Sequence, residues 1–153
     1  MLSPHFSLEE MVASDYAARH GIDNEPSALV IVNLSALCAD VLEPLRAILG
    51  PIRVTSGYRS AELNPLVGGA VNSDHMLGLA ADIVAPPRSI DELGAVVRSQ
   101  LRLPIKQCIR EFGAWIHISR IPLTDESDET IAQFLIASRS ERGTVDYVRW
   151  EAA

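Results

Sequence analysis

Between residues 24 and 49, apolar side chains recur every three or four positions, which is the spacing of one face of an α-helix. Asn24-Glu25-Pro26 places a proline near the first turn, and Gly50-Pro51 ends the pattern. The apolar stripe consists of Leu34, Leu37, Cys38, Val41, Leu45, Ile48 and Leu49. This segment is therefore predicted to be the clearest helix of the protein, with its stripe facing a core.

Three other segments have helical signals. Ser7 can cap a short helix whose first turn is acidic. Ser89 can cap another over residues 89–101, again with acidic residues in the first turn. In the tail, an acidic turn at 125–128 precedes a predicted helix over 129–138.

Short runs of β-branched and apolar residues predict strands between the helices. The last two strands of the central region form a hairpin whose turn is Glu111-Phe112-Gly113. An apolar patch follows near the end of the tail. The predicted strands are 52–55, 81–84, 105–109 and 114–119, and the patch is 145–150.

The segment from Ser56 to Gly78 is rich in glycine and asparagine and has little periodicity. A loop of this length inside a compact domain is uncommon, and function is the usual reason for one. Helices before and between a few short strands indicate an α+β fold with a small, mostly antiparallel sheet and flanking helices. With 153 residues, the chain is predicted to be a single domain, 1–153.

Charge and composition exclude several classes of partner. The net charge of −7 argues against nucleic-acid binding, and a single lysine, Lys106, argues against a polybasic membrane anchor. No run of about 18 apolar residues predicts a membrane span, and the amino terminus lacks the basic segment of a secretory signal. We therefore expect a protein that is cytoplasmic as synthesised. Cys38 and Cys108 are expected to be buried thiols rather than a disulfide.

Two of the four histidines, His75 and His117, are candidates for metal binding, whereas His5 and His20 lie in polar surroundings. Asp82 lies in the apolar run Ala80-Ala81-Asp82-Ile83-Val84, where an ionised carboxylate is costly unless it is paired or bound to a metal. Two histidines and one carboxylate form the three-ligand set that catalytic zinc uses when a fourth position is left for water. The alternative is a histidine buried in the core with ordinary hydrogen bonds.

Several separated motifs occur in a specific order along residues 4–120. They are Phe6-Ser7-Leu8-x-Glu10, Asn24-x-Pro26, Val54-Thr55-Ser56-Gly57-Tyr58-Arg59-Ser60, Leu63-Asn64, Gly68-Gly69, Ser73-x-His75-x6-Asp82 and Trp115-Ile116-His117. Together they resemble the zinc D-Ala-D-Ala carboxypeptidase family, which shares its metal site with the vancomycin-resistance D,D-dipeptidases and with the hedgehog signalling domain. The opening motifs also resemble a phage-associated branch of small members.

The resemblance implies zinc as cofactor and assigns His75, Asp82 and His117 as its ligands. It implies that Arg59 faces the substrate, where a guanidinium can hold a peptide carboxylate with a planar pair of hydrogen bonds. It also implies that Ser73 lies near the metal and orients the substrate or a ligand.

Metal-dependent hydrolysis needs a carboxylate that takes a proton from water and passes it to the leaving amine. Glu111 is the predicted base, because hedgehog-type domains have a glutamate six residues before the second histidine. The dipeptidases instead have an acidic residue three before that histidine, where this chain has Ala114. Asp74, beside His75, is the alternative base.

The resulting hypothesis is a zinc peptidase that cuts a peptide bond in bacterial peptidoglycan, as a carboxypeptidase or an endopeptidase. Its partners would be peptidoglycan stem peptides. Because no secretory signal is apparent, a holin or phage particle would deliver it to the cell wall, as for a phage endolysin. A zinc-containing binding module without catalysis and a phage structural component with the same fold are the alternatives.

Overall fold

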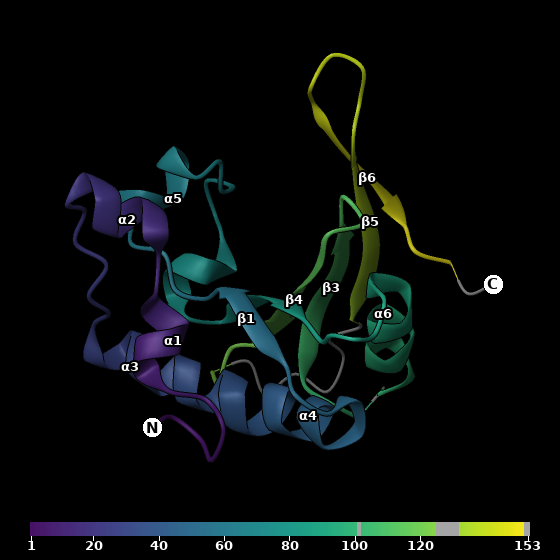
Figure 1. Ribbon diagram of the computed structural model, residues 1–153, viewed down its shortest axis with the longest axis horizontal. Coiled ribbons are helices and arrows are strands. Elements are labelled where there is room, and N and C mark those ends of the chain that lie inside the picture. Colours follow the sequence, from purple (N-terminus) through teal and green to yellow (C-terminus); the bar gives the residue numbers. More distant parts are fainter. Residues whose placement is uncertain (101, 125–131, 152–153) are drawn as a thin grey trace.

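The computed structural model describes residues 1–100, 102–124 and 132–151, and it has an α+β fold built on one six-stranded sheet (Figure 1). The strand order is β1-β2-β4-β3-β5-β6. The sheet is mixed, because β3 pairs with β5 in parallel while the other neighbouring pairs are antiparallel. The strands are β1 Arg53–Ser56, β2 Ala80–Val84, β3 Ile105–Glu111, β4 Trp115–Arg120, β5 Gln133–Arg139 and β6 Val145–Arg149.

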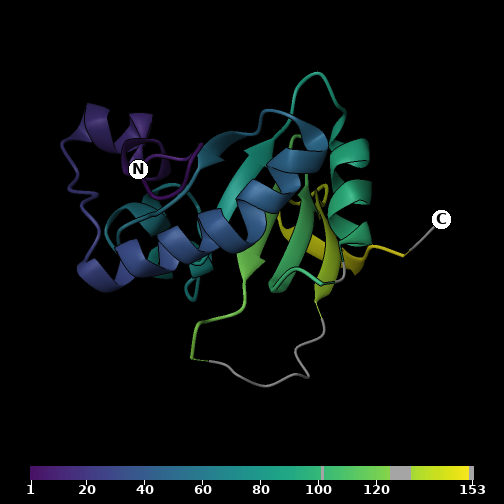
Figure 2. The ribbon, with the colours of Figure 1, turned by 90° about the horizontal axis from the view of Figure 1, so that it is seen from below.

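The helices gather before the sheet and on one of its faces. The short α1 and α2 lie beside α5 at one end of the molecule, and the long helix made by α3, η1 and α4 crosses the sheet (Figures 1 and 2). Helix α6 packs against β3, β4 and α4. The helices are α1 Leu8–Val12, α2 Asp15–His20, α3 Ala28–Leu37, the π-turn η1 Cys38–Leu42, α4 Glu43–Leu49, α5 Leu63–Leu66, the 3₁₀ turn η2 Asp74–Leu77 and α6 Ile90–Ser99.

The two faces of the sheet have different roles. Alternate residues of a strand point to opposite faces, so Ile116 and Ile118 of β4 pack into the core while Trp115 and His117 face the other way. The buried stripe of the long helix covers the core face, as its sequence pattern predicts, except that the predicted Ile48 is 48% exposed and Leu42 is buried in its place. The stripe consists of Leu34, Leu37, Cys38, Val41, Leu42, Leu45 and Leu49.

The long helix, Ala28–Leu49, has 22 residues and a mean hydropathy of 1.7, so its length and composition would allow it to cross a membrane. The sequence analysis predicted no such stretch. In this fold the helix contributes its apolar stripe to the core, and core helices of globular domains meet the same criterion. Its π-turn comes directly before α4, whose second residue, Pro44, has no N–H to donate.

The tail is where the sequence prediction fails. Residues 133–138, predicted as part of a helix over 129–138, belong to β5, while 129–131 and the predicted acidic turn at 125–128 lie outside the described residues. The run Phe134-Leu135-Ile136 is apolar on both sides, because Phe134 packs on the core and Leu135 faces the opposite side. A short run of this kind does not distinguish a strand from a helix.

Two other outcomes concern helix α2 and the cysteines. Helix α2 was not predicted from the sequence; Ser14 caps it and Gly21 ends it in a left-handed conformation. Cys38 and Cys108 are buried free thiols, as predicted, and burial raises the pKa of each to about 12.

Candidate metal centre

Three buried side chains converge on one point of the sheet face opposite the helices. His75 Nε2 lies 3.1 Å from His117 Nδ1 and 3.2 Å from Asp82 Oδ1, and His117 Nδ1 lies 3.0 Å from Asp82 Oδ1. All three residues are less than a tenth exposed. The sequence-predicted metal ligands therefore lie together, although they come from positions up to 42 residues apart.

Each of the three side chains is positioned by a different element. Asp82 and His117 are directly opposite each other on the antiparallel strands β2 and β4, so both point to the same face. His75 lies on η2, and the Ser73 hydroxyl accepts a hydrogen bond from the His75 N–H at the start of this turn. Ser73, predicted to lie near the metal, thus helps to position the turn that carries one of the three side chains.

The ring of His75 is fixed by the loop that follows β1. Its Nδ1 donates to the Gly57 carbonyl over 2.6 Å, and the Arg59 N–H donates to the His75 carbonyl over 3.2 Å. A Cβ at position 57 would overlap the Met11 carbonyl, so the loop can approach this closely only with glycine. With Nδ1 as donor, His75 presents a lone pair at Nε2. Burial lowers the pKa of His75 more than Asp82 raises it, which favours this neutral form.

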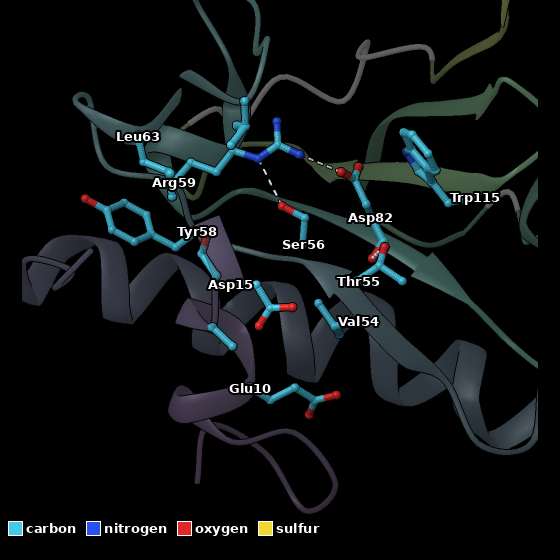
Figure 3. A pocket seen from close by; sticks show the side chains of 13 residues that line it. Glu10, Asp15, Val54, Thr55, Ser56, Tyr58, Arg59, Leu63, Asp82 and Trp115 are labelled. Atoms are coloured by element: carbon cyan, nitrogen blue, oxygen red, sulfur yellow. Dashed lines mark hydrogen bonds and ion pairs between the residues drawn. The ribbon is translucent and has the colours of Figure 1, made fainter. Parts of the chain in front are cut away.

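Asp82 is held through both of its oxygens. Oδ1 faces the two histidines, and Oδ2 accepts a hydrogen bond from Arg59 Nη2 over 2.7 Å (Figure 3). Arg59 Nε donates to Ser56 Oγ, which fixes the guanidinium plane. Burial alone would raise the pKa of Asp82, but the contacts with the imidazoles of His75 and His117 outweigh it and lower the pKa. Asp82 is therefore ionised at neutral pH.

This arrangement fits a bound zinc ion. His75 Nε2 and Asp82 Oδ1 are both acceptors, so they need a cation or a shared proton between them. Tetrahedral zinc with bonds of about 2.0–2.1 Å separates its ligands by about 3.3 Å, close to the 3.0–3.2 Å found among these atoms. The Gly57 carbonyl on His75 and the Arg59 guanidinium on Asp82 are partners of the kind that orient zinc ligands.

A cleft of about 480 Å³ opens beside Asp82 (Figure 3). One wall comes from β1, Arg59 and Trp115, and the facing wall comes from α1 and α2 and includes Glu10 and Asp15. Trp115 Nε1 is buried and has no hydrogen-bond partner among the described residues. Neither acidic residue of this wall was predicted to lie at the site. Glu10 is on the predicted helix after Ser7, and the Ser14 cap and the Gly21 stop are the signals that could have indicated α2 and Asp15.

The two predicted general bases have different surroundings. Glu111 ends β3 and faces the same side of the sheet as His117, since Glu111 pairs with Trp115 and Ile109 pairs with His117. Burial and then the charge of Asp82 raise the pKa of Glu111, while His117 and Arg59 act in the opposite direction. Asp74 forms an ion pair with Lys106, whose Nζ lies 2.8 and 2.9 Å from its two oxygens.

Comparison with known proteins assigns this geometry to a family. The model of the peptidase M15 family matches residues 4–119, which include all three metal-site residues and Glu111. The chain belongs to the peptidase M15 family. The zinc D-Ala-D-Ala carboxypeptidase of Streptomyces albus G is 42% identical over 60 residues, which are 38% of this chain and 24% of that protein. This match spans about a quarter of that relative.

The family match ends at β4, so β5 and β6 lie outside it. The M15 match confirms the resemblance found in the sequence. The zinc named in the relative agrees with the donor set of this site, which has two imidazole nitrogens and one carboxylate oxygen.

The M15 metal site leads to a prediction about the histidines. His75→Ala or His117→Ala should abolish zinc binding, because either change leaves two protein ligands. His5→Ala and His20→Ala should retain it, since these side chains bond Glu43 and the Tyr16 carbonyl instead. Elemental analysis of the four purified variants measures this, and equal zinc content in all of them would refute the assignment.

Arg59→Lys tests how the M15 site holds Asp82. Lysine retains the charge but cannot bond Asp82 and Ser56 in the same plane, so the carboxylate loses its fixed orientation. Loss of such a partner typically lowers metal affinity by about 10- to 100-fold. Competition with a zinc chelator measures the change. Arg53→Lys, on exposed β1, is the matched control and should leave the zinc affinity unchanged.

Proposed function

We propose that this protein is a zinc metallopeptidase that hydrolyses a peptide bond in peptidoglycan stem peptides. The observation that carries the proposal is the buried His75, Asp82 and His117 triad, which lies beside an open cleft and on the same sheet face as Glu111. Zinc held there supplies a Lewis acid for the scissile carbonyl and lowers the pKa of attacking water. The similarity to the zinc D-Ala-D-Ala carboxypeptidase of Streptomyces albus G supports a D-Ala-D-Ala end as the substrate.

Glu111 is the general base that transfers the proton of the attacking water. Its raised pKa places the carboxyl nearer to neutrality than an exposed glutamate, which suits a group that accepts a proton from water and returns it to the leaving amine. The ionised form is the active base, so the rate is expected to rise with pH through the pKa of Glu111. Asp74 is less suited to this role, because Lys106 holds its carboxylate in an ion pair.

Arg59 and Trp115 orient the substrate in the cleft. Two of the three guanidinium nitrogens of Arg59 bond Ser56 and Asp82, which leaves Nη1 for a substrate oxygen. A guanidinium has five N–H groups, so one N–H of Nη2 also remains, and the Nη1–Nη2 end can still form the two-point carboxylate pair predicted from the resemblance. Trp115 lines the same cleft and lies beside Glu111, whose pKa its side chain lowers.

The cellular setting is part of the proposal. A peptidase of the phage-associated type would reach peptidoglycan after release through a holin or from a phage particle. A zinc-binding module of hedgehog type would keep the three ligands and have no turnover, and the measurement below distinguishes it from an enzyme.

Glu111→Gln tests the enzyme directly. The amide retains the shape but accepts no proton, so turnover of purified peptidoglycan fragments should fall by about 100- to 10,000-fold. Zinc content should not change, because Glu111 is not one of the three converging residues. The mass lost from the fragments, measured by mass spectrometry with the wild-type protein and zinc, identifies the bond that is cut.

The stability of this variant provides its control. The pKa of Glu111 is higher in the folded protein than in the unfolded chain. In the metal-free protein, ionisation of this carboxyl therefore disfavours the folded state once the pH exceeds the pKa that Glu111 has in the unfolded chain. Removal of the charge should therefore leave the free energy of unfolding at pH 7 unchanged or higher. Full activity in Glu111→Gln would assign proton transfer to another group, and no wild-type turnover would favour the binding module.

A further inference from the structure

The sheet face that carries the metal site continues across the β5–β6 hairpin. Pairing places Glu111 beside Ala137, and Ala137 beside Tyr147. A second row runs from Asp82 through His117, Ile109 and Leu135 to Arg149. Paired residues of neighbouring strands point to the same face. Tyr147 and Arg149 are therefore on the same face as the metal site, although both lie beyond the part of the chain that the family match covers.

The alternate residues of β6 confirm this orientation. Trp150 packs directly on Gly94 of α6, so its side of the hairpin faces the helices. Val148 has the same parity as Trp150, whereas Tyr147 and Arg149 have the opposite one. Tyr147 is 55% exposed and Arg149 is exposed, so both side chains are accessible from the solvent side of the sheet.

An apolar floor lies between the hairpin and the metal site on this face. It consists of Ile109 and Ala137, which are buried, and Leu135, which is half-buried and is the part that a ligand can contact. Because Ala137 is small, the phenol of Tyr147 can lie over it toward Glu111. Partial burial and the neighbouring Glu111 carboxylate raise the pKa of Tyr147, so the phenol stays protonated and can donate a hydrogen bond.

Charge separates the two flanks of the metal site. The cleft flank carries the carboxylates of Glu10 and Asp15, while the cation there, Arg59, is already paired with Asp82. The hairpin flank carries one carboxylate, Glu111, and also Arg149, which forms no ion pair with another described residue. Its Cα is three strand spacings, about 14 Å, from that of His117. One substrate residue and the long arginine side chain can bridge this distance together.

We propose that Tyr147 and Arg149 form the subsite for the leaving-group residue of the peptide, with Arg149 and the Tyr147 hydroxyl binding its terminal carboxylate. The apolar floor accommodates a small side chain such as the methyl group of alanine. Glu111, at the same flank, is placed to return the proton to the amine that leaves. This inference rests on the proposed function and makes peptides with a free C-terminus the preferred substrates.

The test compares two peptides that differ in one group. Zinc-loaded Glu111→Gln protein is titrated with an acetylated tripeptide ending in D-Ala-D-Ala and with its C-terminal amide. We expect the free carboxylate to bind about tenfold more tightly, which is the effect of one charge-assisted hydrogen bond. Arg149→Gln in this background should abolish the preference, and Tyr147→Phe should weaken binding of the carboxylate peptide by about tenfold.

Two controls match these substitutions. Val148→Ala changes a side chain of equal exposure, 56%, on the opposite face of the same strand. Arg142→Gln removes an exposed arginine from the hairpin turn. Both should leave the affinity within about twofold, as expected for surface positions outside a binding site.

The outcomes separate this inference from the proposed function. If the two peptides bind equally or not at all, or if the controls behave like Tyr147→Phe and Arg149→Gln, the subsite assignment is wrong even when the wild-type protein cleaves peptidoglycan. If Arg149→Gln abolishes a clear carboxylate preference while the wild-type protein cleaves nothing, the subsite is correct and the protein is a binding module.

Discussion

The structure depends on the burial of one ionised carboxylate, Asp82, in the second strand of the sheet. A buried carboxylate is costly unless positive charge and hydrogen bonds surround it. Here the requirement is met from two sides, by Arg59 at Oδ2 and by the pair of histidines at Oδ1. A divalent cation at the centre of the triad would stabilise the buried carboxylate further. The arrangement that allows Asp82 to be buried therefore also favours metal binding.

Arg59 and His75 reach Asp82 only because a loop without regular structure is held in place. Asn24 donates to the Val12 and Tyr58 carbonyls and accepts from the Ser60 N–H, which joins the N-terminal segment to the loop after β1. The Tyr58 N–H donates to the Met11 carbonyl, where Gly57 allows the close approach. The small helices α1 and α2 are thus the support of the metal site as well as one wall of its cleft.

The sequence predicts the metal triad because its members have unusual surroundings, such as a carboxylate in an apolar strand. It also predicts the long helix and α6, where apolar periodicity and the Ser89 cap are strong local signals. It does not predict the partner of Arg59, because the pairing with Asp82 joins residues 23 positions apart through the bulge in β1. It does not predict β5 either. The short apolar run of this segment is compatible with a helix or a strand, and the parallel pairing with β3 makes it a strand.

That parallel contact also determines what surrounds the metal. In an antiparallel hairpin the strand after β4 would be its immediate neighbour, but both edges of β4 are already taken by β2 and β3. The chain therefore adds β5 and β6 beyond β3, on the flank where Glu111 lies. The metal is left between an acidic wall from the N-terminal helices and a hairpin with an arginine on its face. In a chain with a net charge of −7, this local asymmetry would favour one orientation of the peptide that we propose as substrate, with its negatively charged end toward the hairpin.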